Sequence, residues 1–531
     1  MQNKLYDPAL SESAEPGPSV SRGAGDRSPV PLMTARSRAV AWRLALTVWL
    51  VYVLHFSSNV VRETYLAVTL AERFSIRVDE YLGLHPDLFQ IEGRGSFINN
   101  NPGASLLGAL PYAAGRPFVS LLFSVRPELA QPKPPAQYND PRPNRTRFMN
   151  EARARGVDVK LVLAAAITHA GLMAPLAALA AVVMFFFLRA RLRNESRAMW
   201  LALLYAFGTP VFFRSAFLNQ NVLLTHCVLF AYVIVAGFSA RTDREPIAPV
   251  RAALAGLFLG LGVLCDYSAA PLFLVFGIWV MSEGFRGPTR GRSGWQAGAA
   301  YALGALGPGL ILLLYQWRAF GNPLLPAQAY MPATEYSVKG WNGFVWPTIT
   351  LLKDNLISLQ YGLLVFCPML IAALLAPWMK RAAGSPNARE LRFIFAATLA
   401  TYLFNSSIQF AHLQFNTGVR YMVPVVPLLF MALVPVLLAA PRWLTWLLVV
   451  PTMVISWSVS MAREDVPTSL MRVFLRGFEL PWLTVLEKTA SGYAPFLANG
   501  VSAIPIFCLT AVVLWLLWRG LNSHDSAGRQ A

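Results

Sequence analysis

Residues 62–111 read RETYLAVTLAERFSIRVDEYLGLHPDLFQIEGRGSFINNNPGASLLGALP and directly follow the first long apolar run of the chain. The part of this stretch up to residue 92 is rich in carboxylates, which are Glu63, Glu72, Asp79, Glu80, Asp87 and Glu92. In a chain of mostly lipid-compatible residues, so many ionisable groups beside one apolar run usually mark a functional site. We therefore expect the rest of the chain to be a scaffold that holds this stretch at a bilayer surface.

The composition is that of a polytopic membrane protein. The 531 residues are 55% hydrophobic and only 14% charged, whereas soluble proteins carry about 25% charged residues. The net charge of +18 does not indicate nucleic acid, because the Lys and Arg residues cluster in short loops between apolar runs, as the positive-inside rule requires. Membrane lipids are the expected surroundings, and nucleic acid is excluded as a partner.

The apolar runs predict an all-α integral membrane protein with about twelve transmembrane helices, each needing about 20 residues. Basic clusters fall at alternate ends of these runs; one example is Arg189–Arg193 after the run 161–188. With twelve spans both termini are cytoplasmic.

The predicted organisation is one membrane domain between two tails. Residues 1–40, rich in Ser, Pro, Gly and Arg, predict a disordered cytoplasmic tail. A large first external loop is expected to contain interfacial helices, one of them at 104–123. The expected boundaries are 41–519 for the membrane domain, about 61–160, 318–361 and 461–500 for the three external segments, and 520–531 for the C-terminal tail.

Arg62 and Glu63 lie where the first span is expected to end. A carboxylate at the boundary between membrane and water meets the headgroup of a lipid-linked substrate, and a low dielectric suits it to general-base catalysis. The alternative is that both residues are interface-level charges that end a span. Glu63 is the first candidate for the catalytic base, and Arg62 a candidate for substrate binding.

Asp79, Glu80 and Tyr81 form a second acidic cluster further along the loop. Paired acids of this kind bind a divalent metal or sugar hydroxyls, and a tyrosine stacks on a sugar ring. Asp79 and Glu80 are therefore alternative catalytic carboxylates, and Tyr81 a substrate-binding candidate. The alternative is a solvated turn. A divalent metal is compatible with the pair, and no other cofactor is predicted.

Two further polar turns are candidates for substrate binding. The bend at 93–103, which includes Asn101, precedes an apolar helix, whose N-terminal backbone amides can face a phosphate. Asp266 lies in a short turn between two apolar runs at the external edge. It either orients an acceptor or is a polar helix end.

Arg420 and Tyr421 precede the tenth apolar run, on the side predicted to be external. An arginine there departs from positive-inside placement, and guanidinium binds phosphate bidentately. Arg420 is therefore a candidate for holding a lipid phosphate, with Tyr421 and His412 beside it. The alternative is an ion pair with a carboxylate of an external loop.

The order of several short motifs resembles the polytopic membrane glycosyltransferases of the GT-C fold, the group that includes protein O-mannosyltransferases and lipid A aminoarabinose transferases. After the acid at Glu63 come LAVTLAERFSIRVDEYLG, GRGSFINNNPGASLLGALPY, YQWRAFGNPLLPAQAY, GLLVFCPML and GVRYMVPVVPLL. The resemblance covers most of the chain from about Trp42 to Arg519. Two departures are that Arg62-Glu63 stands where many members have Asp-Glu, and that Asn-Asn-Pro-Gly replaces a Lys-Pro-Pro-Gly-like stretch.

This resemblance implies that a sugar passes from a polyprenyl-phosphate carrier to a hydroxyl acceptor on the outer face of the membrane. In a bacterium this membrane would be the inner (plasma) membrane. An acid of the first external loop would deprotonate the acceptor hydroxyl, which would then displace the lipid phosphate with inversion at the sugar. By position this acid is Glu63, with Asp79 or Glu80 as the alternative. Arg420 would hold the carrier phosphate. The acceptor is a lipid, a glycan or a protein.

Two other classes of function remain as alternatives. A multi-span transporter or lipid flippase would show two related halves and binding groups near the bilayer midplane, and the chain shows no convincing repeat. A non-catalytic assembly subunit would tolerate the combined loss of Glu63, Asp79 and Arg420.

Overall fold

The computed structural model describes residues 34–137, 143–238, 246–286, 290–379, 384–416, 418–489, 496 and 500–519. The elements up to the first long membrane helices are α1 (Ala35–Leu54), α2 (Arg62–Arg73), η1 (Asp79–Tyr81), β1 (Leu88–Ile91), β2 (Gly95–Ile98), α3 (Gly103–Val125), η2 (Pro127–Ala130), α4 (Pro143–Ala154), α5 (Asp158–Thr168), the π-turn η3 (His169–Met173) and α6 (Ala174–Leu192). The remaining elements are α7 (Glu195–Gly208), α8 (Pro210–Arg214), α9 (Gln220–Ala236), α10 (Pro249–Cys265), η4 (Tyr267–Ala269), α11 (Ala270–Gly284), α12 (Arg290–Phe320), η5 (Ala327–Ala329), α13 (Ile349–Ile357), α14 (Leu363–Phe366), η6 (Pro368–Trp378), α15 (Ala388–Ser406), η7 (Gln409–Asn416), η8 (Val423–Val425), α16 (Val426–Ala439), α17 (Arg442–Ala462), α18 (Val466–Arg476), α19 (Pro481–Thr489) and α20 (Ile504–Trp518).

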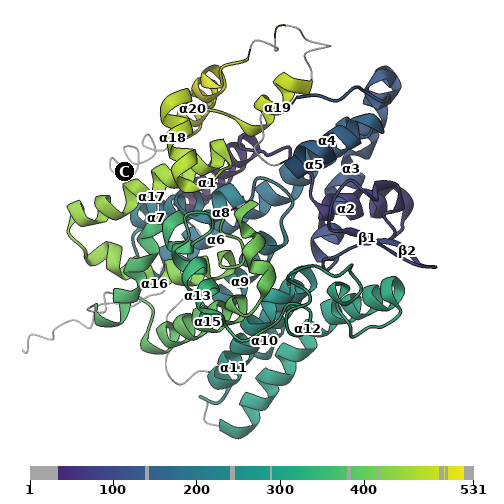
Figure 1. Ribbon diagram of the computed structural model, residues 1–531. Helices are drawn as coiled ribbons and strands as arrows, with labels where there is room; N and C mark the ends of the chain where they lie inside the picture. The colour runs from purple at the N-terminus through teal and green to yellow at the C-terminus, as the bar shows by residue number, and fades with distance from the viewer. Residues whose placement is uncertain are drawn as a thin grey trace, which may run out of the picture.

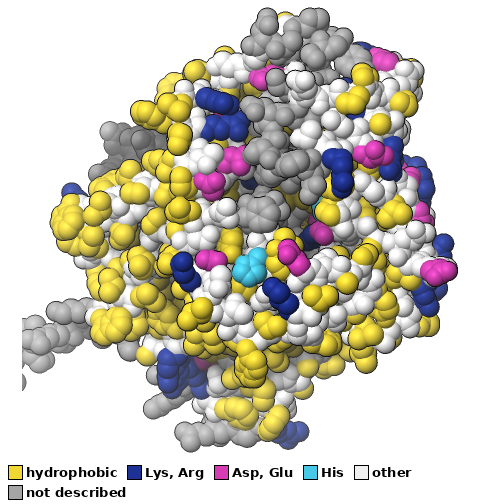
Figure 2. Space-filling view, in the orientation of Figure 1, with side chains coloured by type: hydrophobic (Ala, Val, Ile, Leu, Met, Phe, Trp, Pro, Cys, Tyr) yellow, Lys and Arg dark blue, Asp and Glu magenta, His cyan; other side chains and the backbone are white. Residues whose placement is uncertain are grey.

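The helices form a central bundle, with the first external loop, helices α10 to α12 and helices α18 to α20 around it (Figure 1). Helices α1, α6, α7, α9, α16 and α17 share the largest apolar core. The first external loop, from α2 to α5, packs on one side of this bundle, and helices α10 to α12 pack on another. Figure 2 shows hydrophobic side chains over much of the visible face, while many of the charged side chains lie toward the side of the first loop.

The prediction of an all-α membrane protein is confirmed. Six helical segments are long and apolar enough to cross a bilayer, by length and composition: 35–54, 103–125, 158–192, 267–284, 292–320 and 442–462. Shorter apolar helices lie at 220–236, 249–265, 368–378, 423–439 and 504–518. The count of twelve spans stays a prediction.

The first span begins and ends earlier than expected. The side chain of Thr34 accepts from Ser37 N in a capping box, so α1 begins at Ala35, within what was predicted to be a disordered tail. Arg36 pairs with Glu195 over 3.0 Å, and Arg38 is exposed to water, so both basic residues fit in its first turns. Residues 1–33 and 520–531 lie outside the described part of the chain. Because α1 ends at Leu54, Glu63 is not at the end of the first span but on a separate helix, α2.

The first external loop contains a small sheet that the sequence analysis did not predict. Strands β1 and β2 pair antiparallel, with Phe89 opposite Phe97 and Leu88 opposite Ile98. These side chains are buried in a second apolar cluster, against α2, α3 and α12. The expected helix at 104–123 is present as α3, whose outer face exposes Leu110, Phe118 and Leu121.

Helices α10 and α12 approach each other through glycine. A Cβ at Gly256 of α10 would lie 1.9 Å from the backbone oxygen of Tyr301, and one at Gly304 of α12 would lie 1.9 Å from that of Ala253. Small residues spaced in this way let helix backbones pack closely in a membrane. Helix α10 ends at Cys265, directly before the turn that carries Asp266.

A buried ion pair joins the ends of α6 and α15. Arg191 donates to both carboxylate oxygens of Glu390, over 2.7 and 2.8 Å. Glu390 also caps the start of α15 with Asn387. This pair lies at the end of the bundle that the basic clusters predict to be cytoplasmic.

Candidate active site

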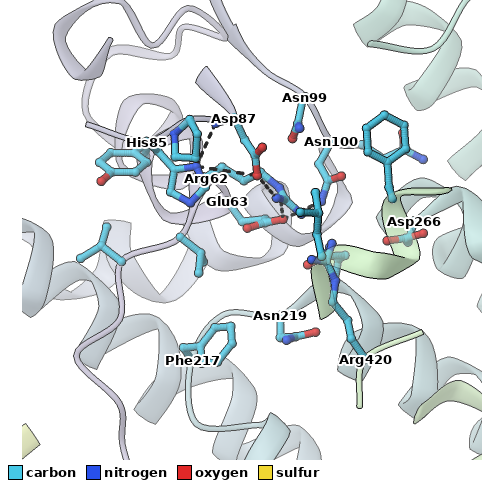
Figure 3. A pocket seen from close by; sticks show the side chains of 18 of the residues that line it. Arg62, Glu63, His85, Asp87, Asn99, Asn100, Phe217, Asn219, Asp266 and Arg420 are labelled. Carbon is cyan, nitrogen blue, oxygen red and sulfur yellow. Dashed lines mark hydrogen bonds and ion pairs between the residues drawn. The ribbon is translucent and has the colours of Figure 1, made fainter. Parts of the chain in front are cut away.

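A cavity of about 1650 Å³ lies between the first external loop and the central bundle. Most of its lining is aliphatic or aromatic, and it includes side chains of α4, α5, α12 and α19. Its polar lining includes Arg62, Glu63, His85, Asp87, Asn99, Asn100, Asn101, Arg214, Asn219, Gln220, Asp266 and Arg420. Figure 3 shows Arg62, Glu63, Asp87 and Asn100 close together, with Asp266 and Arg420 across from them.

Glu63 is the most buried carboxylate of this site, with 1% of its surface exposed. It lies in the first turn of α2, where the positive end of the helix dipole stabilises a negative charge. Its Oε1 accepts from Arg62 Nε over 3.0 Å and from Asn100 Nδ2 over 2.7 Å. Both of these donors bind Oε1. Among the described residues, Oε2 is therefore left to accept a proton from a hydroxyl group.

Gln220 joins Glu63 to Arg420. With its amide nitrogen turned toward Glu63, it donates to Oε1 over 3.1 Å. Its oxygen then accepts from Asn100 Nδ2 over 2.9 Å, from Arg62 Nη2 over 3.1 Å and from Arg420 Nη2 over 3.2 Å. One amide thus links the candidate base with the candidate phosphate ligand, and residues 63 and 420 face the same cavity.

Arg62 is shared between two carboxylates. Its guanidinium pairs with Glu63 and with Asp87. Burial alone would lower the pKa of Arg62, but the two carboxylates raise it above its usual value. Burial alone would raise the pKa of Asp87. The charge of Arg62, together with His85 and Arg420, outweighs burial and lowers the pKa of Asp87 below its usual value. Arg62 therefore stays charged and orients Glu63, while Asp87 fixes Arg62.

His85 stands beside this group as a neutral imidazole. Its Nδ1 accepts from the backbone N of Asp87 over 3.1 Å, which leaves the ring proton on Nε2. Burial lowers the pKa of His85; Arg62 and Arg420 lower it further, and Asp87 and Glu63 oppose them.

We expect this histidine to make folding pH-dependent. An unfolded chain protonates histidine near pH 6.5, whereas His85 resists protonation in the fold, so stability declines as the pH falls from about 7 toward the lowered value. The melting temperature of His85→Gln, measured by thermal unfolding, should therefore fall less over this pH range than that of wild type. The matched control is His412→Gln, outside the cavity; equal pH slopes for wild type and His85→Gln would contradict the prediction.

The Asn-Asn-Pro-Gly bend docks on the end of α10. Asn101 Nδ2 donates to the backbone oxygen of Val263 over 2.7 Å. A Cβ at Gly103 would lie 2.6 Å from the backbone oxygen of Leu264, so a side chain there would push the two segments apart. Asn101 lines the cavity, but its amide nitrogen serves this contact, and the bend places Asn100 against Glu63.

Asp266 and Arg420 meet through Asn221. Asp266 caps η4 by accepting from Ser268 N over 2.8 Å, and its Oδ2 accepts from Asn221 Nδ2 over 3.3 Å. The oxygen of the same amide accepts from Arg420 Nε over 3.2 Å. Asp266 thus lines the same cavity as Arg420, with one oxygen engaged in a helix cap.

Arg420 forms no ion pair with a carboxylate among the described residues. Its guanidinium is held by Gln220 and Asn221 and lies 4.8 Å from the ring of Tyr421, which also lines the cavity. Neutral amides orient a cation without neutralising it, so its charge is available to an anion. The alternative of an ion pair with a loop carboxylate is not observed in the described part.

The second acidic cluster lies outside the cavity. Asp79 accepts from the backbone N of Ser96 over 2.6 Å, and Glu80 pairs with Arg73. Tyr81 is 1% exposed and packs against Tyr65, which leaves no face for a sugar. His412 stacks on Tyr336. Tyr336 lines the cavity, whereas His412 does not. These four residues are not brought together with Glu63.

The donor set does not fit a divalent metal. In the described part of the chain no group of three or more His, Cys, Asp or Glu side chains could hold one. Asp79 and Glu80 make separate contacts, and between Glu63 and Asp87 the position of a cation is taken by Arg62.

Several site residues were missed from the sequence. Gln220 and its neighbours form Asn219-Gln220-Asn221, consecutive amides at the start of an otherwise apolar helix. Amides in such surroundings need partners, and that signal was available. Arg214, which is buried beside Phe217 in the cavity wall, was also not among the predicted site residues.

Comparisons with known proteins give one structural likeness. No family model and no curated protein matches the chain. Among solved structures, the chain is similar to the crystal structure of ArnT from Cupriavidus metallidurans bound to undecaprenyl phosphate, with 15% sequence identity and a TM-score of 0.45 over 93% of this chain and 79% of that chain. With so few identical side chains, the roles of the pocket residues here follow from their own contacts.

Proposed function

We propose that the chain is a membrane glycosyltransferase that moves a sugar from a polyprenyl-phosphate carrier to a hydroxyl acceptor on the outer face of the membrane. One observation carries the proposal: the Gln220 amide joins the buried Glu63 carboxylate to Arg420, a cation without a carboxylate partner among the described residues. A base and an anion site therefore face one cavity whose walls are mostly apolar.

The chemistry follows from these two groups. The acceptor hydroxyl gives its proton to Glu63 Oε2 as its oxygen bonds to the anomeric carbon. The bond from that carbon to the phosphate oxygen breaks on the opposite side, which inverts the sugar. The leaving phosphate gains negative charge, which Arg420 stabilises. Arg62 and Asn100 hold Glu63 in place throughout.

The test uses the purified protein in lipid, radiolabelled polyprenyl-phosphate sugars and a membrane extract as the source of acceptor. Label should pass to the extract and free polyprenyl phosphate should accumulate. If no carrier is consumed and labelled substrate instead crosses sealed vesicles, the proposal fails and a transporter takes its place.

We expect Arg420→Ala to raise the KM for the donor about ten- to hundredfold, because a hydrogen bond to a charged group contributes about 1.5–3 kcal/mol. Arg420→Lys should restore part of this loss, because it keeps the charge without the bidentate geometry. The matched control is Arg77→Ala, an exposed arginine of the first loop. Equal effects of Arg420→Ala and Arg77→Ala would contradict a phosphate contact at Arg420.

A further inference from the structure

Helix α18 turns its most hydrophobic face away from the protein. Met471, Phe474, Leu475 and Phe478 are 60, 88, 71 and 55% exposed. They follow the helical spacing, so they form one stripe along α18 and the residues just after it. Ser469 and Val466, which are buried, face inward. In water a helix of this kind would bury the stripe, so the stripe faces an apolar medium.

The position of α18 identifies that medium. It packs against α17, which is long and apolar enough to cross a membrane, and begins a few residues after α17 ends at Ala462. The opposite end of α17 carries Arg442, which the positive-inside rule places in the cytoplasm. Helix α18 therefore lies at the outer surface of the bilayer.

The flank of the stripe is basic. Arg472 and Arg476 lie along one side of it, and Arg472 pairs with Glu479 over 2.6 Å. An apolar stripe with arginines beside it is the pattern of a helix that lies in the plane of a membrane interface, with its stripe among acyl chains and its arginines at phosphate headgroups.

Helix α19, which follows after a short turn, forms part of the cavity wall. Trp482 Nε1 donates to the backbone oxygen of Leu54 at the end of α1 over 3.0 Å. Trp482, Val485 and Leu486 line the cavity, on a wall that also includes Phe148 of α4. In Figure 1, α19 lies between α18 and α20 on one side and helices α4 and α5 on the other. The same short segment thus reaches both the bilayer surface and the cavity.

We propose that α18 is an interfacial helix embedded in the outer leaflet and that it holds α19 in place. Helix α19 then forms the wall of a path along which the apolar chain of the donor passes between the bilayer and the cavity. The role of α19 rests on the function proposed above; the position of α18 does not. The predicted third external segment, 461–500, would then be partly membrane-embedded.

The position of α18 is tested without any activity. The full chain, with the exposed Cys508 replaced by Ser, is labelled with a fluorophore at Phe474→Cys and placed in vesicles of phosphatidylethanolamine and phosphatidylglycerol. Lipids with a nitroxide near the headgroup end of the acyl chain should quench this label, and aqueous iodide should not. Glu92→Cys, at the exposed turn of the hairpin, is the aqueous control. Quenching mainly by iodide, or protection from both quenchers by a covering protein, would overturn the proposal.

The role of α19 is tested by donor chain length. Phe474→Asp places a charge in the stripe and should raise the KM about tenfold for a full-length polyprenyl-phosphate sugar, a change of about 1.4 kcal/mol. A water-soluble donor with a short isoprenoid chain should be unaffected. Trp346→Asp, at an exposed aromatic outside the cavity lining, should change neither KM. Equal losses with both donors, or no loss, would refute the chain route; if wild type uses neither donor, the proposed function fails while the quenching result still decides the position of α18.

Discussion

Glu63→Gln should lower the rate of sugar transfer at least about a hundredfold, because general-base catalysis typically contributes a factor of about 10²–10⁴. The amide keeps the size of the side chain but cannot take the acceptor proton. Arg62 keeps its pairing with Asp87, so the cation is not left unpaired and the variant should fold. The measurement is the release of polyprenyl phosphate in single turnovers at saturating donor.

The controls for this variant are Asp79→Asn and Glu80→Gln. Both residues lie outside the cavity, and we expect both variants to retain transfer. Transfer that survives in Glu63→Gln but is lost in either control would move the base to the second acidic cluster. Donor binding, measured separately, should be nearly unchanged in Glu63→Gln, which distinguishes a lost base from a collapsed pocket.

The largest loss of stability is expected for Gly256→Ala. The new Cβ would lie 1.9 Å from the backbone oxygen of Tyr301, so α10 and α12 would have to move apart along their whole contact. Overpacking of this kind costs about 1–3 kcal/mol and occasionally more, and here the obstacle is backbone, which cannot rotate away. Thermal unfolding can be followed in a Cys508→Ser background with a dye that reacts with the buried thiols of Cys265 and Cys367 as they become accessible.

Gly307→Ala, in α12, is the matched control. A Cβ there meets nothing within 4 Å, and alanine favours a helix over glycine by about 1 kcal/mol. This variant should therefore be unchanged or slightly stabilised, although it makes the same chemical change. A similar loss in both variants would show that helix propensity rather than close packing sets the effect at Gly256.

The sequence was sufficient for the class of fold. Long apolar runs separated by basic clusters have few solutions other than membrane helices, and the runs coincide with helices. The helix boundaries were harder to predict, because the cap at Thr34 and the ion pair of Arg36 with Glu195 let α1 begin within a polar segment. The hairpin at Leu88–Ile91 and Gly95–Ile98 was missed because each strand is only four residues long.

For the candidate site, sequence position identified Glu63 and Arg420 but not what joins them. Both could be proposed because a charge at a membrane edge is unusual wherever it occurs. Gln220 and Asn221 carry no charge, and their role depends on the start of α9 lying beside both α2 and the segment before α16. From the sequence, Asp79 and Glu80 stayed open as alternatives to Glu63, because their contacts with the backbone at Ser96 and with Arg73 are decided only by the fold.

The junction at Gln220 also bears on when the protein acquires its chemistry during synthesis. Residues 63, 220 and 420 are separated by most of the chain, so a nascent chain carries its carboxylate long before its guanidinium. Until α9 is inserted and the segment before α16 has emerged, neither the amide bridge nor the anion site exists. A half-made or truncated chain therefore lacks the assembled site, and under the proposed function it would transfer no sugar.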